Sequence, residues 1–215
     1  MKKSLVILVA VLMLICFTKN IFAAENTFNI GFDHLSSSTA EVMGNHWLHT
    51  YMTGDILKLE YLADYYKVEL NYANLDTGFI DGKVALTEII GGYKVFDGVF
   101  IILNMYKQNS STYDDAITGY LAGIDGTYHL KNNMSIKGFV EVSLPYEARK
   151  WGIPVNILAD IWGFRCNIFD YGFQFSQSIT DKVNIHFSFR SLKATVNLDS
   201  YYIGTMSSLG VTYSF

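Results

Sequence analysis

The chain has 215 residues, with 15 Tyr, 15 Phe and 17 Gly against only 2 Pro, and a formal net charge of −4. An acidic chain without a cluster of Lys and Arg is a poor candidate for nucleic-acid binding. Aromatic residues favour strands and glycine allows tight bends, while no segment beyond the N-terminus is apolar over the roughly 18 residues that a spanning helix needs. The composition therefore indicates an all-β protein.

The N-terminus has the pattern of a cleavable signal peptide. Two lysines precede an apolar run from Leu5 to Phe17, and Ala23 marks the expected cleavage point. This run is shorter than the roughly 20 residues of a membrane-spanning helix. We expect residues 1–23 to be removed on export and residues 24–215 to form one domain. Removal of residues 1–23 takes away three lysines and no acidic residue, so the net charge of residues 24–215 is −7. Cys166 is then the single cysteine, which excludes an internal disulfide.

Alternation of apolar and polar residues with period 2 predicts strands along the rest of the chain. The first segment shows the pattern clearly, since Phe28, Ile30 and Phe32 alternate with polar or small residues. Ten segments follow this pattern: Asn26–His34, Ile56–Asp64, Tyr66–Tyr72, Val84–Val95, Val99–Tyr106, Ile117–His129, Met134–Leu144, Phe169–Ser176, Val183–Arg190 and Ile203–Phe215. Residues 156–167 are ambiguous between strand and loop, so eight strands are the alternative to ten.

The connections between these segments are alternately short and long. The short ones are Ala63–Tyr65, Phe96–Gly98, Lys131–Asn133 and Thr180–Lys182, and the long ones are Leu35–Asp55, Asn74–Lys83, Lys107–Ala116, Pro145–Cys166 and Ser191–Ser200. An antiparallel up-and-down barrel produces this alternation, because its short turns lie at one rim and its long loops at the other.

The distribution of charge indicates which face of the strands points inward. The apolar set is large and nearly free of charge, as a lipid-facing belt must be, and tyrosines gather near the strand ends. The polar set carries both signs, which suits the interior of a small barrel filled by its own side chains. The predicted lumen-lining residues are Lys58, Glu60, Lys67, Glu69, Glu88, Lys137, Glu141, Asp170, His186 and Arg190.

The C-terminal segment carries a resemblance to a known superfamily. Leu209, Val211, Tyr213 and Phe215 alternate with small polar residues up to the last position. This tail resembles the final strand of bacterial outer-membrane β-barrel proteins of eight to ten strands. The resemblance implies that the barrel-assembly machinery reads this tail. It also implies a monomer surrounded by outer-membrane lipid, with its long loops available to an extracellular partner.

Two motifs suggest chemistry, and both are weak. His186 and Ser188 project to the same face of a strand, so a serine lies near a potential base. The His-x-Ser pair resembles that of outer-membrane lipid hydrolases, but Phe189 follows where those families have Asn, and the pair points into the lumen. His46 and His49 provide half of a metal site only if their segment is helical. We therefore expect no enzyme, no metal and no cofactor.

Three functions remain for such a barrel: a structural or surface-interaction protein, a narrow channel for ions or small solutes, and an envelope-lipid hydrolase. The first is favoured because a barrel of eight to ten strands is usually filled by its own side chains. We expect cross-strand ion pairs involving Lys58, Glu60, Lys67 and Glu69. We also expect Arg190 to pair with a carboxylate, with Asp170 the nearest by register.

Overall fold

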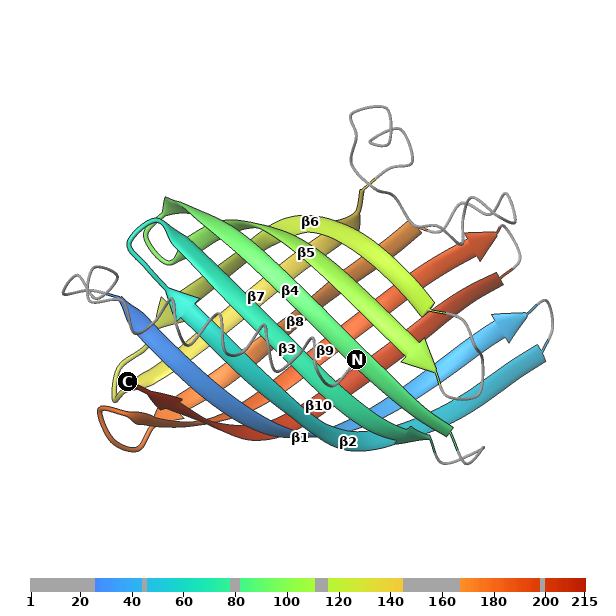
Figure 1. The fold of residues 1–215 in the computed structure, drawn as a ribbon, viewed down its shortest axis with the longest axis horizontal. Helices are drawn as coiled ribbons and strands as arrows, with labels where there is room; N and C mark the ends of the chain where they lie inside the picture. The colour runs from blue at the N-terminus through green and yellow to red at the C-terminus, as the bar shows by residue number, and fades with distance from the viewer. Residues whose placement is uncertain (1–25, 44–45, 78–81, 111–115, 145–166, 198–199) are drawn as a thin grey trace.

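The structure, a computed structural model, describes residues 26–43, 46–77, 82–110, 116–144, 167–197 and 200–215. These residues form ten antiparallel strands that close into one barrel (Figure 1). The strands are β1 (Thr27–Met43), β2 (His46–Leu62), β3 (Tyr66–Thr77), β4 (Gly82–Phe96), β5 (Val99–Ser110), β6 (Ala116–His129), β7 (Met134–Ser143), β8 (Asn167–Ser178), β9 (Val183–Asn197) and β10 (Ser200–Ser214). The predicted up-and-down barrel is confirmed, with ten strands rather than eight.

The barrel closes where the first strand meets the last. β1 pairs with β10 from Asn29 opposite Ser214 to Met43 opposite Ser200. Each of the other strands pairs with its neighbours in sequence. Closure leaves no strand with a free edge, and every strand along the wall can therefore satisfy its backbone hydrogen bonds within the protein.

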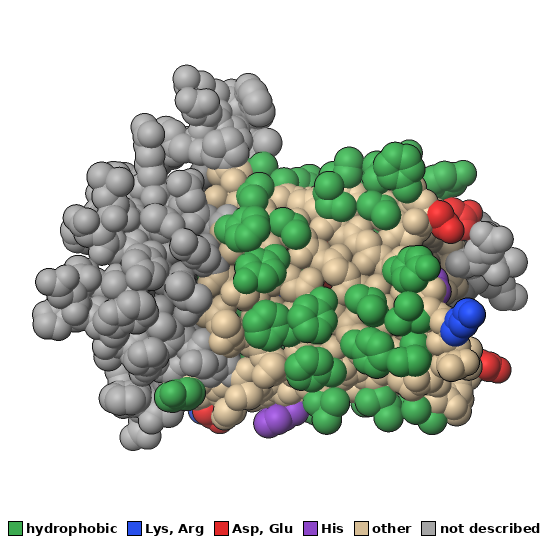
Figure 2. Space-filling view, turned by 180° about the vertical axis from the view of Figure 1, so that it is seen from behind, with side chains coloured by type: hydrophobic (Ala, Val, Ile, Leu, Met, Phe, Trp, Pro, Cys, Tyr) green, Lys and Arg blue, Asp and Glu red, His purple; other side chains and the backbone are tan. Residues whose placement is uncertain are grey.

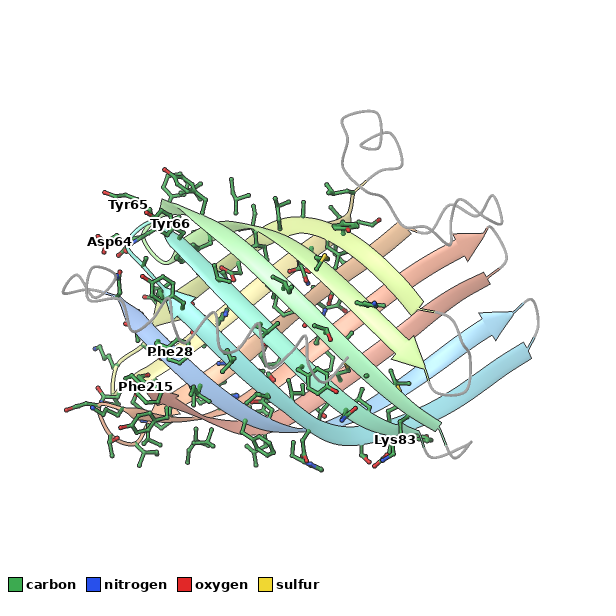
Figure 3. All side chains as sticks on the ribbon, viewed as in Figure 1. Phe28, Asp64, Tyr65, Tyr66, Lys83 and Phe215 are labelled. Atoms are coloured by element: carbon green, nitrogen blue, oxygen red, sulfur yellow. The ribbon has the colours of Figure 1, made fainter. Side chains whose placement is uncertain are left out.

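The short turns all lie at one rim, where the chain also ends (Figure 1). Three turn residues have positive φ angles: Gly98 at 72°, Asn132 at 62° and Asn133 at 58°. Glycine and asparagine adopt this conformation more readily than other residues. In Figure 3, Tyr65 and Tyr66 mark this rim and Lys83 lies at the opposite one. The predicted short turns are thus present at one rim.

Three of the predicted long loops, Leu35–Asp55, Asn74–Lys83 and Ser191–Ser200, are wrong, because most of their residues belong to strands. β1 continues to Met43 and β2 begins at His46, so Leu35–Asp55 is largely a paired extension of the wall. In the same way, β9 and β10 occupy most of Ser191–Ser200. The sequence of these extensions lacks the regular apolar alternation on which the strand prediction relied. The signal peptide and residues 145–166, which include Cys166, lie outside the described residues.

The outer surface carries a belt of exposed apolar side chains, seen over the middle of the barrel in Figure 2. Its members include Phe32, Leu57, Val68, Ile101, Leu103, Ile124, Val140, Val142, Phe173, Ile185, Phe187, Leu209 and Val211. On β1 the belt ends at His34, which pairs with Asp55 at 3.0 Å on the outer surface. On β3 it runs from Tyr66 to Tyr72. With a rise of about 3.3 Å per residue and a tilt near 40°, these seven residues span roughly 18 Å of height, which is somewhat less than the ~25 Å lipid-facing band of membrane barrels.

The interior has two apolar clusters beside its charged residues. The first contains Leu35, Ala73, Leu75 and Val84, with Met52, Ile56, Leu86 and Met206 packed against it. We call this set the apolar collar; it lies on β1 to β4 and β10. The second cluster contains Ile90, Phe100 and Ile102, with Leu62 packed against it. On β2 and β4 the collar residues precede Lys58 and Glu88, so the collar lies toward the long-loop rim.

Candidate functional site

The interior is organised around three groups of charged and polar side chains, and the first centres on Asp33. The Asp33 carboxylate accepts hydrogen bonds from Lys58 Nζ at 2.6 Å and Ser208 Oγ at 2.7 Å, and His186 Nε2 lies 2.7 Å from its Oδ1. Ser208 in turn lies 2.5 Å from Ser188, oxygen to oxygen. Asp33 is fully buried. A buried carboxylate persists only when it is paired and hydrogen-bonded, and here four strands supply its environment.

Gly210 creates the space in which this first group assembles. It faces Asp33 on β1 and His186 on β9 in the strand register. A Cβ at this position would lie 2.7 Å from Nε2 of His186 and closer still to the Asp33 carboxylate. Because glycine lacks that atom, side chains from two strands that are not neighbours meet directly above β10.

The second group joins opposite walls of the barrel through two lysines. Lys137 on β7 donates to Glu69 at 2.5 Å and lies 3.5 Å from Glu60, which are on β3 and β2. Lys67 on β3 binds Glu69 at 2.8 Å and also pairs with Asp125 on β6. In a ring of ten strands β7 lies diametrically opposite β2. The contact between Lys137 and Glu60 therefore crosses the lumen.

The third group centres on Arg190. Its guanidinium binds the Asp170 carboxylate through two nitrogens, with the shortest contact at 2.5 Å, and reaches Glu88 at 2.6 Å. Asp170 is on the neighbouring strand β8, whereas Glu88 is on β4, diametrically opposite β9. Asn71 Nδ2 donates to Glu88 at 3.3 Å, and the Arg190 side chain lies over the Phe139 ring. This arginine is a second bridge across the lumen.

Asn104 and Glu141 form a separate pair. Asn104 Nδ2 on β5 donates to Glu141 Oε2 on β7 at 2.9 Å, across the intervening strand β6. On β6 the residue in register with Glu141 is Gly123, where a Cβ would lie 2.8 Å from Cγ of Glu141. Both side chains are 2% exposed.

These groups surround one cavity of about 180 Å³. Its polar lining includes Lys58, Glu60, Glu69, Glu88, Lys137, Glu141 and Arg190. The other three predicted lumen residues, Lys67, Asp170 and His186, are buried against the lining through the contacts described above. The cavity is also lined by members of the apolar collar, including Leu35, Ile56 and Met206.

The pairing inside the barrel differs in part from the sequence-based expectation. Arg190 pairs with Asp170 as expected. Lys58, Glu60, Lys67 and Glu69 each take part in a cross-strand ion pair as expected, but the partners come from β1, β6 and β7. Between β2 and β3, Glu60 lies opposite Glu69, and Lys58 lies opposite Asn71. Two like charges face each other in this register, and Lys137 supplies their cation from the opposite wall. Sequence spacing within one strand carries no information on contacts across a lumen.

The sequence analysis missed several interior polar residues, among them Asp33, Asp125 and Asn104. Their parity was visible, since Asp33 alternates with Phe32, Asp125 with Ile124, and Asn104 with Leu103. Each belongs to the polar face of its strand and is buried in the structure. Parity alone identifies such residues as inward-facing, although it does not name their partners.

The two chemical motifs do not assemble into reactive sites. Ser188 lies against Ser208, while His186 Nε2 is engaged by Asp33 and its Nδ1 lies 3.4 Å from Thr212, so no contact joins His186 to Ser188. The backbone at His46 and His49 belongs to β2, not to the helical turn that a metal pair there requires. Within the described residues, no group of three or more His, Cys, Asp or Glu side chains could hold a metal ion.

The C-terminal residue is tied to the first strand. The Phe215 backbone N donates to the Phe28 carbonyl at 3.0 Å, and the two rings lie 5.8 Å apart between centroids. The Tyr213 ring lies 4.9 Å from that of Phe215 in an edge-on arrangement. Figure 3 shows Phe28 and Phe215 at the short-turn rim. The predicted tail residues Leu209, Val211, Tyr213 and Phe215 are all exposed on the outer face.

Comparison with solved structures finds this fold among outer-membrane proteins. The outer membrane protease OmpT from Escherichia coli is similar with a TM-score of 0.51 at 9% identity, over 88% of this chain and 96% of that chain. An outer membrane channel from Pseudomonas putida F1 gives 0.44 at 8% identity, over 88% and 95% of the two chains. Neisserial surface protein A gives 0.39 at 11% identity, over 87% and 97%.

A scan with models of protein families gives no match, and neither does a search among curated protein sequences. Within the residues that the structure describes, there is no helix long and apolar enough to cross a membrane. The closed ten-stranded barrel with its apolar outer belt defines the class: the chain has the fold of a bacterial outer-membrane β-barrel protein. This agrees with the predicted outer-membrane location. At such low identities the likeness concerns the fold alone.

Proposed function

We propose that the protein is an outer-membrane barrel closed by its own side chains, with a structural or surface-interaction role and no enzymatic activity. It is surrounded by outer-membrane lipid, is inserted by the barrel-assembly machinery and acts as a monomer. Its long-loop rim extends beyond the lipid belt, because β1 and β2 remain paired from His34 opposite Asp55 to Met43 opposite His46. This raised wall is the part that meets an extracellular partner.

The observation that carries the closed lumen is the pair of bridges across the barrel diameter. Lys137 on β7 contacts Glu60 on β2, and Arg190 on β9 contacts Glu88 on β4. Moving Arg190 aside would leave the buried carboxylates of Glu88 and Asp170 without their cation, which is strongly unfavourable in a confined interior. Moving Lys137 aside would leave Glu60 opposite Glu69 with only Lys67 to offset the two charges. Both bridges are thus expected to persist and to obstruct the path of a solute.

The size of the remaining space supports the same conclusion. The cavity of about 180 Å³ is smaller than the roughly 300–1,000 Å³ of a typical small-molecule pocket. A general porin needs a continuous aqueous channel, which barrels of 16 to 18 strands provide and small barrels usually do not. The alternative of a narrow channel predicts steady ion conduction through the gaps between the bridges.

Single-channel recording in planar bilayers tests this proposal. We expect the wild-type protein to give no discrete conductance steps. The double variant Lys137→Ala and Arg190→Ala removes both diametric bridges and should conduct measurably. Lys182→Ala, at an exposed turn, serves as a matched control for loss of a cation and should remain silent. Regular steps from the wild-type protein would overturn the closed-lumen proposal and favour the channel.

A further inference from the structure

Glu141 differs from the other buried carboxylates of the lumen in having no cation as its partner. Seven interior carboxylates face four cationic groups, which leaves three net negative charges when His186 is neutral. The carboxylates are Asp33, Glu60, Glu69, Glu88, Asp125, Glu141 and Asp170, and the cations are Lys58, Lys67, Lys137 and Arg190. Among the residues that the structure describes, every one of these carboxylates except Glu141 lies within 4.0 Å of a Lys or Arg nitrogen.

The neighbour of Glu141 points to a missing hydrogen-bond donor as well. Asn104 Nδ2 is used by Glu141, but Asn104 Oδ1 is buried and accepts no hydrogen bond from the part of the chain that is described. Both residues are 2% exposed and both line the cavity. A buried carbonyl oxygen without a donor is unfavourable, and such groups in native proteins usually have a water or ligand as partner. Two acceptors therefore lie side by side at the cavity, and within the described residues Glu141 has no Lys or Arg nitrogen within 4.0 Å.

On the opposite half of the barrel, the part of the cavity wall toward the long-loop rim is an apolar patch. Leu35, Ile56, Ala73, Leu75, Leu86 and Met206 line it, from β1 to β4 and β10. Asn104 and Glu141 come from β5 and β7. A cavity with a mostly apolar wall and a few convergent polar groups is the usual form of a small-molecule site.

We infer that this cavity binds a small amphipathic organic cation, of the class of a protonated primary amine on a short alkyl chain. Its ammonium group donates to Glu141 and to Asn104 Oδ1, and its chain packs against the apolar collar. The three ammonium hydrogens match the need for donors, and the positive charge offsets that of Glu141. An anion is excluded by the nearby carboxylates of Glu88 and Asp170. The collar faces the long-loop rim, so the ligand enters from that side.

The size and chemistry of the cavity limit the choice of ligand. About 180 Å³ corresponds to the volume of roughly six waters, at about 30 Å³ each, which suits an amine with a chain of several carbons. A dedicated transition-metal site does not fit, because no cluster of three His, Cys, Asp or Glu side chains that could hold a metal occurs within the described ranges. The apolar collar would also add nothing to the binding of a bare metal ion.

Calorimetric titration of the full mature barrel in lipid nanodiscs, with protein-free nanodiscs subtracted, tests this inference. The probes are hexylammonium, methylammonium and hexanoate. We expect saturable binding of hexylammonium, weaker binding of methylammonium and none of hexanoate. Equal binding of hexanoate, or no binding of hexylammonium above that to protein-free nanodiscs, would overturn the inference.

Two variants separate the contributions of charge and apolar wall. Glu141→Gln keeps the shape and removes the charge, so we expect hexylammonium affinity to fall about tenfold or more. Asp64→Asn, at the exposed turn labelled in Figure 3, removes a carboxylate outside the cavity and should leave affinity unchanged. Met206→Gln makes the apolar collar more polar, so it should weaken the binding of hexylammonium but not that of methylammonium. Unchanged affinity in Glu141→Gln, with a folded barrel, counts against the site. Calorimetry measures binding and not ion conduction, so the result of this experiment is independent of the test of the closed lumen.

Discussion

Asp33 on β1 and His186 on β9 contact each other at 2.7 Å although β10 lies between their strands. The contact exists because Gly210, the β10 residue in register with both, has no side chain. Lys58 and Ser208 complete the shell of the same carboxylate. Four strands that include both ends of the sheet are therefore tied together at the point where the barrel closes.

Replacing Gly210 tests the importance of this close approach. Gly210→Ala places a Cβ against Asp33 and His186, and overpacking of this kind typically costs about 1–3 kcal/mol. We expect the free energy of unfolding in lipid vesicles to fall by that amount in urea titrations. Gly91→Ala is the matched control, since a Cβ there has no atom within 4 Å. A similar loss of stability in both variants would show that an added methyl group is unfavourable on either strand, β10 or β4. The contacts around Asp33 would then not be the cause of the loss in Gly210→Ala.

The orientation of the strands relative to lipid is tested by arginine substitutions on the outer belt. Val140 and Phe173 are 48% and 46% exposed near the middle of β7 and β8. Val140→Arg or Phe173→Arg should lower the free energy of unfolding by about 2–4 kcal/mol, as expected for a cation near the bilayer midplane. The measurement is equilibrium unfolding of the barrel in vesicles.

The control for this substitution lies on the opposite face of the same strand. Gln174 faces the lumen and donates to Ser176 at 3.1 Å. Gln174→Ala should cost much less than Phe173→Arg. If the lumenal change proved as damaging as the lipid-facing ones, the assignment of the two faces would be wrong.

Two buried carboxylates are expected to respond in opposite ways to neutralisation. Asp170 is fully buried and holds Arg190 through two hydrogen-bonded nitrogens, so Asp170→Asn should destabilise the barrel by about 3–5 kcal/mol. Glu141 has no bound cation among the described residues, so Glu141→Gln should be neutral or stabilising. Unfolding midpoints of the two variants, measured side by side, check this. Equal destabilisation would indicate that Glu141 has a cationic partner after all.

The expectation for the C-terminal residue concerns assembly more than folded stability. Phe215 is 64% exposed, so its side chain makes few contacts that a substitution could remove. Phe215→Asp should reduce the amount of heat-modifiable barrel in the outer-membrane fraction while export continues. Phe96→Asp is a suitable control, because Phe96 is a 74% exposed aromatic residue at another turn of the same rim. Comparable losses in both variants would point to a general effect of charge at this rim.

The fold was predictable from the sequence wherever a strand crosses lipid, because lipid imposes an apolar residue at every second position. Phe28, Ile30 and Phe32 show this alternation, and β1 was predicted from Asn26 to His34. Beyond His34 the alternation disappears from the sequence, and the strand continues to Met43 without this signal.

The interior was predictable as a face but not as a set of contacts. Parity placed Lys137, Glu60 and Arg190 inside, and the adjacent-strand pair of Arg190 with Asp170 followed from register. Contacts across the diameter, such as that of Lys137 with Glu60, depend on strand tilt, stagger and side-chain length together. Gly210 and Gly123 also carried a signal, since a glycine on the inward face of a strand often marks a close approach.

The closed lumen is tested most directly by the permeation of a small sugar into liposomes that contain the folded, heat-modifiable protein. The account predicts that liposomes in iso-osmotic arabinose swell no faster with the wild-type barrel than without protein, because Lys137 and Arg190 bridge the lumen. The double variant Lys137→Ala and Arg190→Ala should swell faster. Rapid, size-dependent swelling with the wild-type protein would contradict the account and identify the barrel as an open porin.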